Sequence, residues 1–302
     1  MDELIVISGK GGTGKTSITA SFAALADNAV IVDCDVDAAD MHLLLQPEVA
    51  ERHTFRSGHE AVIRPADCIG CGICMDYCRF EAITQQTGEE GRVTCAVDPV
   101  ACEGCGVCVR VCPRDAIDFP ECECGEWMIS DTRSGPLVHA RLGVAAENSG
   151  KLVALVRTEA RRLAEAKHCK QIIVDGPPGI GCPVIASVTG ATRVLVITEP
   201  SVSGEHDLER VLALTKHFKI ATAVCVNKWD LNPAMTERIE KQAAAQDAQI
   251  VGRIPYDPGV TGAQMEGRAV VETGSTAAQA VRAIWRELDN QTESTRRLAD
   301  AP

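Results

Sequence analysis

Eight cysteines fall into two short sets whose residue type and spacing could hold metal clusters. Both sets have the spacing C-x2-C-x2-C-x3-C, and their members are Cys68, Cys71, Cys74 and Cys78, then Cys102, Cys105, Cys108 and Cys112. Three thiolates this close together on a glycine-rich loop can bind three corners of a cubane of iron and sulfide. The fourth cysteine of each set is expected to begin a helix that carries it to the other cubane. The predicted ligands are Cys68, Cys71, Cys74 and Cys112 for cluster one, and Cys102, Cys105, Cys108 and Cys78 for cluster two.

The two sets belong to an internal duplication. CIGCGICMDYCRFEAI (68–83) aligns with CEGCGVCVRVCPRDAI (102–117), and the glycines of the two copies match. Pro113 follows Cys112 whereas Arg79 follows Cys78, which predicts a positive charge beside cluster two and clusters of unequal potential. The segment resembles a bacterial ferredoxin with two [4Fe–4S] clusters. A zinc ribbon is the alternative, but zinc needs only four ligands and rarely uses a third cysteine at this spacing.

Two neighbouring features have more than one interpretation. Cys122 and Cys124, with C-x-C spacing, are candidates for an extra metal site, although two ligands are too few alone and free thiols are the alternative. The segment 84–100 is expected to be a hairpin with Gly88 and Gly91 at its tip, and it is either a docking surface or a spacer.

The segment GKGGTGKT (9–16) predicts a loop that binds phosphate. It fits G-x-x-x-x-G-K-[ST] between a strand-like run and a helix-like one. In that context backbone N–H groups and the helix N-terminus surround phosphate oxygens, Lys15 contacts the β- and γ-phosphates, and the Thr16 hydroxyl binds Mg²⁺. The nucleotide contacts predicted here are Gly9, Lys10, Gly11, Gly12, Thr13, Gly14, Lys15, Thr16 and Ser17.

An early second lysine, Lys10, makes this loop similar to the deviant Walker A motif of the MinD/ParA/Mrp family of ATPases, to which the nitrogenase iron protein is related. The resemblance implies that Lys10 reaches the phosphates bound by the other subunit of a dimer. That subunit is either a second copy of this chain or a paralogue.

The resemblance also implies roles for acidic residues that follow two of the strands. Asp35 would orient the attacking water, so the predicted catalytic residues are Lys10, Lys15 and Asp35. The predicted magnesium ligands are Thr16, Asp33 and Asp175. Asp37 and Asp40 follow Asp35 so closely that they either blur this assignment or belong to a solvated loop.

Two later motifs complete the predicted nucleotide site. IIVDGPPG (172–179) resembles a Walker B strand followed by switch II, which tracks the γ-phosphate with Gly176, Pro177, Pro178 and Gly179. In VNKWD (226–230), Asn227 is expected to contact adenine, and Pro255 lies where the family's late loop packs on the base. The same motif resembles N-K-x-D of GTPases, so GTP is the alternative to ATP.

Short β-branched runs alternate with helical patterns in most of the chain. The predicted strands are 3–8, 29–33, 171–175, 193–198, 222–227 and 248–255. This alternation predicts an α/β P-loop NTPase fold, with a mostly parallel sheet flanked by helices. It stops between 64 and 125, which predicts an inserted small α+β ferredoxin domain. The predicted divisions are 1–63 and 126–290 for the ATPase domain, 64–125 for the insertion and 291–302 for a disordered tail, with a hairpin or strand pair at 126–143.

Composition excludes several classes of protein. The 302 residues are 45% apolar and carry a net charge of −12, so nucleic acid and anionic lipid are poor electrostatic partners. No apolar run is long enough to span a bilayer and the chain starts on a strand rather than a signal peptide, so we expect a cytoplasmic protein without membrane insertion. Fifteen cysteines in such a chain favour metal ligation over disulfides.

The whole chain resembles MinD-superfamily ATPases with an inserted ferredoxin domain, labelled in places as the cobyrinic acid a,c-diamide synthase type. The resemblance implies ATP, Mg²⁺, two [4Fe–4S] clusters, a dimer and a redox or metal-cluster-binding partner, in an anaerobic setting. Three functions follow: ATP hydrolysis coupled to electron delivery, an Mrp-like carrier or scaffold for metal clusters, and a MinD-like spatial switch. The third is least favoured, because the C-terminal segment lacks the basic amphipathic pattern of a membrane-binding helix.

Overall fold

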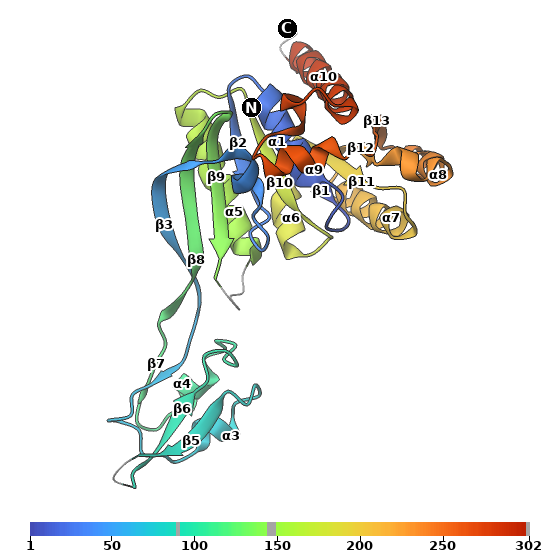
Figure 1. Ribbon diagram of the computed structural model, residues 1–302. Coiled ribbons are helices and arrows are strands. Elements are labelled where there is room, and N and C mark those ends of the chain that lie inside the picture. Colours follow the sequence, from blue (N-terminus) through green and yellow to red (C-terminus); the bar gives the residue numbers. More distant parts are fainter. Residues whose placement is uncertain (89–90, 144–148, 300–302) are drawn as a thin grey trace. The chain divides into compact units, whose positions relative to one another are not determined.

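The chain forms two units (Figure 1). The computed structural model describes residues 1–88, 91–143 and 149–299, with side chains described as far as residue 290. The larger unit contains Met1–His53, Glu126–Leu142 and the chain from Ser149, and the smaller unit contains Thr54–Gly125. The smaller unit begins at residue 54 rather than at the predicted 64, because Ala61 and Ile63 pack into the core that contains the cysteines.

A nine-stranded sheet forms the centre of the larger unit. Its strands, in spatial order, are β13 (Gln249–Ile254), β12 (Ala221–Asn227), β11 (Arg193–Thr198), β1 (Asp2–Ser8), β10 (Gln171–Pro178), β2 (Ala29–Asp33), β9 (Gly135–Leu142), β8 (Glu121–Thr132) and β3 (Glu48–His59). Every neighbouring pair from β13 to β9 is parallel. The structure confirms all six predicted strands, and the expected strand pair at 126–143 corresponds to β8 and β9, which are joined by a two-residue turn.

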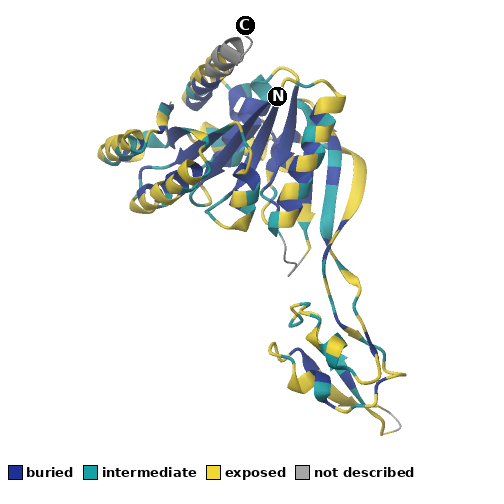
Figure 2. Ribbon diagram, turned by 180° about the vertical axis from the view of Figure 1, so that it is seen from behind, coloured by how far each residue is buried: buried dark blue, intermediate teal, exposed yellow. Residues whose placement is uncertain are grey.

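Helices cover both faces of this sheet, as an α/β protein requires. They are α1 (Lys15–Leu25), α2 (Met41–Leu45), α5 (Ser149–Ala166), α6 (Cys182–Val188), α7 (Val202–His217), α8 (Pro233–Ala245), α9 (Gly259–Met265) and α10 (Thr276–Ala299), with short 3₁₀ turns η1 (Trp229–Leu231) and η2 (Val270–Glu272). Leu4 and Val6 of β1 point into the core shared with α1 and α10, and β1 is buried along its whole length (Figure 2). Successive strand residues face opposite ways, so full burial requires cover on both sides.

The C-terminal segment differs from its prediction. The sequence predicts a disordered tail at 291–302, but α10 continues through Ala299, and residues 300–302 lie outside the described residues. The sequence from Thr276 to Ala299 contains no glycine or proline that would end a helix. In the described part of the chain, no helix is both long and apolar enough to cross a lipid bilayer.

The described part of the smaller unit contains two short antiparallel strand pairs and two single-turn helices. Strand β4 (Val62–Ile63) pairs with β7 (Ile117–Asp118), and β5 (Ile83–Thr87) pairs with β6 (Val93–Val97), both antiparallel. The second pair confirms the predicted hairpin in 84–100, with Gly88 and Gly91 hydrogen-bonded at its tip.

The helices of this unit, α3 (Ile73–Asp76) and α4 (Val107–Val111), correct one prediction. They do not begin at the fourth cysteines: α3 ends before Cys78, and Cys112 is the residue that follows α4. Each helix starts instead after a glycine with positive φ, Gly72 or Gly106, because a left-handed residue lets the chain turn directly from the cysteine loop into the helix.

Candidate functional site

The phosphate loop joins the end of β1 to the start of α1. Gly14, with φ of 89°, precedes the first residue of α1, and a Cβ there would lie 2.5 Å from the Nδ2 atom of Asn227. Glycine therefore satisfies both the backbone conformation and the close approach of Asn227. The loop presents its backbone at the N-terminus of α1, which is the arrangement that binds phosphate.

Lys15 lies at the centre of a buried group of carboxylates. Its Nζ atom is 2.9 Å from Asp175 Oδ2 and 3.4 Å from Asp35 Oδ2, and its side chain is only 6% exposed. Thr16 donates a hydrogen bond of 2.7 Å to the same oxygen of Asp175. The structure thus brings together Lys15, Thr16 and Asp175, which are predicted to bind the nucleotide and its metal, and Asp175 contacts both of the others.

Asp33 shares this region but uses its oxygens differently. Its carboxylate accepts hydrogen bonds from the backbone N–H groups of Asp35, at 3.0 Å, and Met41, at 3.2 Å. These bonds fold the segment after β2, and the side chains of Asp37 and Asp40 in that segment are exposed.

Burial and mutual repulsion set the charges of these groups. Burial raises the pKa of Asp33 well above its ordinary value, the neighbouring Asp175 raises it further, and Lys15 only partly offsets both effects. Burial also raises the pKa of Asp35. Burial lowers the pKa of Lys15, but Asp175 and Asp35 outweigh that effect, so its pKa is raised and Lys15 stays charged. The group has too little positive charge for its carboxylates, which favours binding of a cation such as Mg²⁺.

The turn predicted at 176–179 begins later than expected. Gly176, Pro177 and Pro178 continue β10 rather than forming a turn, and Gly179, with φ of 91°, makes the turn. The backbone N–H of Gly179 bonds to the Ser8 carbonyl at 2.8 Å. The strand extends because the register shifts between Val6 and Ser8, so that Ser8 pairs with Pro178.

The expected base-contact residues are held by the protein itself. Asn227 donates to the Thr13 carbonyl at 2.7 Å and accepts from the backbone N–H of Lys228. Asp230 accepts from the backbone N–H of Tyr256 at 2.7 Å, which ties η1 to the loop that begins with Pro255. These contacts bring the two predicted base-contact segments together. Asp230, which the resemblance to N-K-x-D would assign to guanine, is hydrogen-bonded to Tyr256 instead.

Lys10 bends back onto its own chain. Its Nζ atom lies 2.5 Å from Glu199 Oε1 and donates to the hydroxyls of Ser201, at 3.2 Å, and Ser203, at 2.8 Å. Lys228 Nζ also contacts Glu199, at 3.2 Å, and the Gly12 carbonyl, at 3.1 Å. Although burial raises the pKa of Glu199, the hydrogen bonds from the two lysines outweigh it and lower that pKa. Lys10 must leave these partners before it can act on a phosphate of another subunit.

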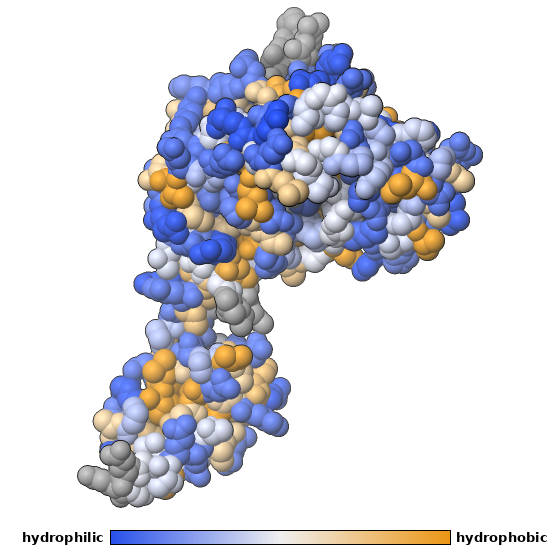
Figure 3. Space-filling model, viewed as in Figure 1, coloured by the Kyte–Doolittle hydropathy of each residue, from blue (hydrophilic) through white to orange (hydrophobic). Residues whose placement is uncertain are grey.

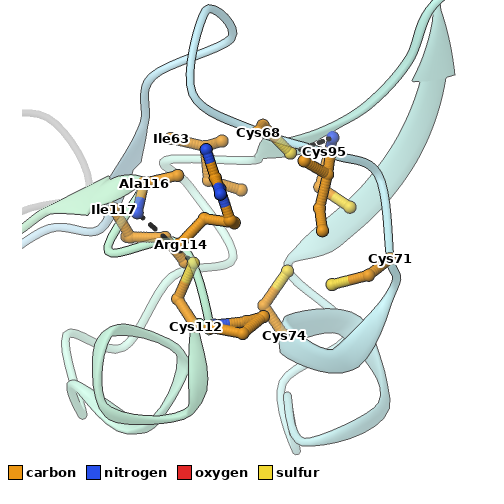
Figure 4. Close-up of a pocket in the computed structure, with 11 residues that line it drawn as sticks. Ile63, Cys68, Cys71, Cys74, Cys95, Cys112, Arg114, Ala116 and Ile117 are labelled. Carbon is orange, nitrogen blue, oxygen red and sulfur yellow. Dashed lines mark hydrogen bonds between the residues drawn. The ribbon is translucent and has the colours of Figure 1, made fainter.

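In the smaller unit, two hollows are each lined by four of the eight cysteines. The first is lined by Cys68, Cys71, Cys74 and Cys112, with Cys95 as a fifth thiol (Figure 4). The second is lined by Cys78, Cys102, Cys105 and Cys108. These groupings are the same as the two predicted ligand sets, with the fourth cysteine of each copy lying in the hollow of the other.

Matching glycines shape both hollows. Gly70 and Gly104 have φ of 62° and 60°, and a Cβ on either would collide with a backbone carbonyl, of Val93 or of His59. Backbone N–H groups also point at the thiols of the first hollow: those of Gly70 and Cys95 donate to Cys68 Sγ at 3.4 Å. Such bonds stabilise negative charge on sulfur.

The charges beside the hollows differ from the prediction for Arg79. Arg79 is exposed and is not among the residues that line the second hollow. Arg114 lines the first hollow instead, and Glu103 lines the second. The duplication matches Arg114 with Phe80 and Glu103 with Ile69, so the two copies differ in charge at both positions.

Among the described residues, no three His, Cys, Asp or Glu side chains meet closely enough to hold one metal ion together. Cys122 and Cys124 therefore have no third ligand there. Cys124 is 6% exposed and its thiol donates to the Ser57 carbonyl at 2.9 Å, as a hydrogen-bonded core thiol does. An extra metal site at these two residues stays a prediction.

Comparison with known proteins decides the family. The sequence model described as "CobQ/CobB/MinD/ParA nucleotide binding domain" matches residues 4–270. The chain belongs to this family. The uncharacterized protein MJ0578 of Methanocaldococcus jannaschii is 33% identical over 234 residues, which cover 76% of this chain and 79% of that one.

Solved structures of CobQ/CobB/MinD/ParA-type proteins have the same fold. The septum site-determining protein MinD of Pyrococcus horikoshii, complexed with Mg-ADP, has a TM-score of 0.58 at 17% identity, covering 96% of this chain and 97% of that one. A ParA-family ATPase of Chlorobium tepidum has a TM-score of 0.54 at 17% identity, covering 95% and 98%. The larger unit therefore has the α/β P-loop fold, as expected for the CobQ/CobB/MinD/ParA nucleotide-binding domain family.

Three residues that contact the candidate nucleotide site were not selected from the sequence. Thr19 donates to the second oxygen of Asp175 at 2.9 Å, Gln264 donates to Ser17 at 2.6 Å, and Glu199 holds two lysines. Glu199 had a recognisable signal, since it directly follows a predicted strand, and the carboxyl ends of parallel strands meet at one edge of the sheet. Gln264 lies on α9, far along the chain, and only the tertiary fold brings it to Ser17.

Proposed function

We propose that this protein is an ATPase that couples its nucleotide state to electron delivery, through two [4Fe–4S] clusters, to a redox partner or a metal-cluster assembly reaction. The observation that carries the proposal is the separation of the eight cysteines into two hollows of four. Four thiols suit a [4Fe–4S] cluster because each thiolate binds a different iron. Such ligands surround a cluster instead of meeting at one point.

Within this proposal each hollow has named ligands. Cys68, Cys71, Cys74 and Cys112 would hold cluster one, and Cys102, Cys105, Cys108 and Cys78 would hold cluster two. When bound, the clusters supply one-electron transfer. Burial raises the pKa of Cys74 to about 12, so the metal-free thiol is neutral and must release its proton to bind iron.

The charged residues beside the hollows would make the two potentials unequal. Arg114 stabilises added negative charge at the first hollow, and Glu103 opposes it at the second. Electrons would therefore move from cluster two to cluster one.

Each charged residue can be replaced with the residue that the duplication aligns with it. This is expected to reduce the difference between the reduction potentials of the two clusters. Arg114→Phe should lower the potential of cluster one, and Glu103→Ile should raise that of cluster two, each by roughly 10–40 mV, because exposed charges interact weakly. Redox titration followed by electron paramagnetic resonance measures both changes. Arg79→Phe is the control and should change neither potential; a shift there as large as that of Arg114→Phe would contradict the assignment.

The part of the proposal that concerns nucleotide binding rests on hydrogen bonds that Mg²⁺ and ATP must replace. Thr16 and Asp175 are both predicted magnesium ligands and are hydrogen-bonded to each other. Binding of the metal to both would therefore change this hydrogen bond. The Asp33 carboxylate accepts a hydrogen bond from the backbone N–H of Met41, the first residue of α2. Strand β3 follows α2 and continues into the smaller unit. A change at Asp33 can therefore be passed along a short, continuous stretch of chain.

The smaller unit also has a surface suited to a protein partner. Figure 3 shows apolar side chains gathered on its visible face. Its exposed large apolar residues are Val62, Ile69, Met75, Tyr77, Phe80, Val93, Val100 and Val107. Exposed apolar patches are typical of binding surfaces.

A carrier or scaffold for metal clusters is the second candidate. It is favoured by the exposure of Cys71 and Cys105, one predicted ligand in each hollow, because an exposed ligand is accessible to an acceptor protein. The likeness to MinD structures concerns the fold alone and adds nothing to the third candidate, a spatial switch.

An anaerobic redox titration of the iron-loaded protein, with and without Mg²⁺ and a non-hydrolysable ATP analogue, tests the proposal. Coupling is reciprocal, so a nucleotide that stabilises one redox state must shift the potential. We expect a shift of about 60 mV, which corresponds to roughly 1.4 kcal/mol for one electron. An unchanged potential in protein that binds the nucleotide would overturn the coupling and favour the carrier. Failure to bind iron and sulfide at all would overturn the cluster assignment.

A further inference from the structure

Cys95 is a fifth thiol in the first hollow, outside the repeated cysteine motif. It lies on β6 and is only 3% exposed. Its backbone N–H donates to Cys68 Sγ at 3.4 Å, and its side chain lines the hollow together with those of Cys68 and Cys74. Figure 4 shows Cys95 beside Cys68 at the wall of the hollow, with the four motif cysteines around the same space.

The second hollow has a different residue in the corresponding place. Residues two apart on a strand face the same way, so Cys95 and Val97 belong to one face of β6. Cys95 lines the first hollow and Val97 lines the second. One strand therefore supplies a thiol to one hollow and an apolar side chain to the other, which makes the second hollow a natural control for the first.

We propose that Cys95 is a reserve iron ligand of the first hollow, able to take the place of Cys74. This inference rests on the proposed function, since it requires a cluster in that hollow. In the exchange, the bond between iron and Cys74 Sγ breaks, a bond between the same iron and Cys95 Sγ forms, and one proton passes from Cys95 to Cys74. No electron is gained or lost, so no further reactant is needed.

Local contacts identify Cys74 as the ligand that Cys95 replaces. Both side chains line the same hollow, so a change of side-chain rotamer can bring Cys95 Sγ to the place of Cys74 Sγ. Cys68 accepts the backbone N–H of Cys95 and is held in place as its neighbour. Cys71 is exposed, whereas Cys74 and Cys95 are both buried and can exchange within the hollow.

Matched removal of one ligand from each hollow tests the inference. Cys74→Ala and Cys108→Ala remove cysteines that the duplication aligns, and Cys95→Ala and the Cys74→Ala/Cys95→Ala double variant remove the reserve thiol. Each variant is loaded anaerobically with iron and sulfide. The measurements are iron and sulfide content and the electron paramagnetic resonance of [4Fe–4S] and [3Fe–4S] species.

We expect the parent protein, Cys95→Ala and Cys74→Ala each to retain about eight iron atoms per chain in two [4Fe–4S] clusters. Cys108→Ala and the double variant should lose one intact cluster, with iron falling to about half or a [3Fe–4S] signal appearing. The cluster left in each variant shows that the unit still folds.

Loss of cluster one from Cys74→Ala, as complete as the loss of cluster two from Cys108→Ala, would overturn the inference while leaving the proposed function intact. A parent protein that binds no iron would instead overturn the proposed function, so the two failures are distinguishable.

Discussion

Mixing a Lys10→Ala variant with a Lys15→Ala variant is expected to restore ATP hydrolysis that neither has alone. Each substitution should lower the rate by about 10²–10³-fold, because each removes a cation from the transferring phosphate. If Lys10 acts on the partner subunit, the mixed dimer has one complete site, made of Lys15 from one chain and Lys10 from the other. Equal mixing makes half of the dimers mixed, so roughly a quarter of the parent rate should return.

The contacts of Lys10 make this test informative. Lys10 is held in its own chain by Glu199, Ser201 and Ser203 and has no direct contact with Lys15 among those described. A Lys10 that acted only within its own chain would leave both sites of the mixed dimer incomplete. Mixtures that form dimers with ATP and still do not hydrolyse it would therefore contradict action on a second copy. A Lys10→Ala/Lys15→Ala double variant mixed with Lys10→Ala is the control, because no subunit then supplies Lys10.

Replacing Lys15 with methionine is expected to destabilise the larger unit, most strongly at high pH and without Mg²⁺. Lys15 is the buried cation facing Asp33, Asp35 and Asp175, and removing one partner of a buried charge group costs about 3–5 kcal/mol. The pKa of Asp33 is raised by burial and then by Asp175, so the folded state binds a proton that the unfolded state releases as pH rises above the ordinary value of 3.8. Stability therefore falls as pH rises, and more so without Lys15.

Urea unfolding at pH 5 and pH 8, with and without Mg²⁺, measures this effect. The loss in free energy of unfolding should be greater at pH 8, where the carboxylates must ionise, and Mg²⁺ should recover part of it by supplying the missing charge. Lys10→Met is the matched control: Lys10 is 29% exposed, and the loss should stay below about 1 kcal/mol at both pH values. An equal effect of Lys15→Met at the two pH values would show that repulsion among the carboxylates is not the cause.

Much of the fold follows directly from local sequence. Most of the six predicted strands are short runs of buried, largely apolar residues, and a parallel sheet covered on both faces needs this pattern regardless of distant contacts. The edge strand β13 is only partly buried. The phosphate loop is equally local, because its glycines, lysine and threonine are consecutive and its geometry depends on one strand-to-helix turn. Lys15 and Thr16 could be selected because they belong to this loop, and Asp35 and Asp175 because they lie at or just after the end of a predicted strand.

The grouping of the cysteines was also accessible from sequence, because duplicated spacing limits which thiols can surround one space. The sequence did not show that each short helix precedes the fourth cysteine, because this order depends on where Gly72 and Gly106 turn the chain. Arg79 does not line the second hollow, because a residue next to a ligand in sequence need not face the hollow. Arg114 and Glu103 line the hollows instead, by the direction of their side chains.

Contacts between distant segments were decided by the tertiary structure alone. Cys95 faces the first hollow because β5 and β6 pair in one register, and no spacing rule links it to the cysteine motif. Glu199 meets Lys10 because β11 lies beside β1 in the sheet, although the two residues are far apart in the chain. Local sequence determines which chemical groups are present and which turns present them. The pairing of strands determines which of those groups meet, because strand order and register depend on packing over the whole sheet.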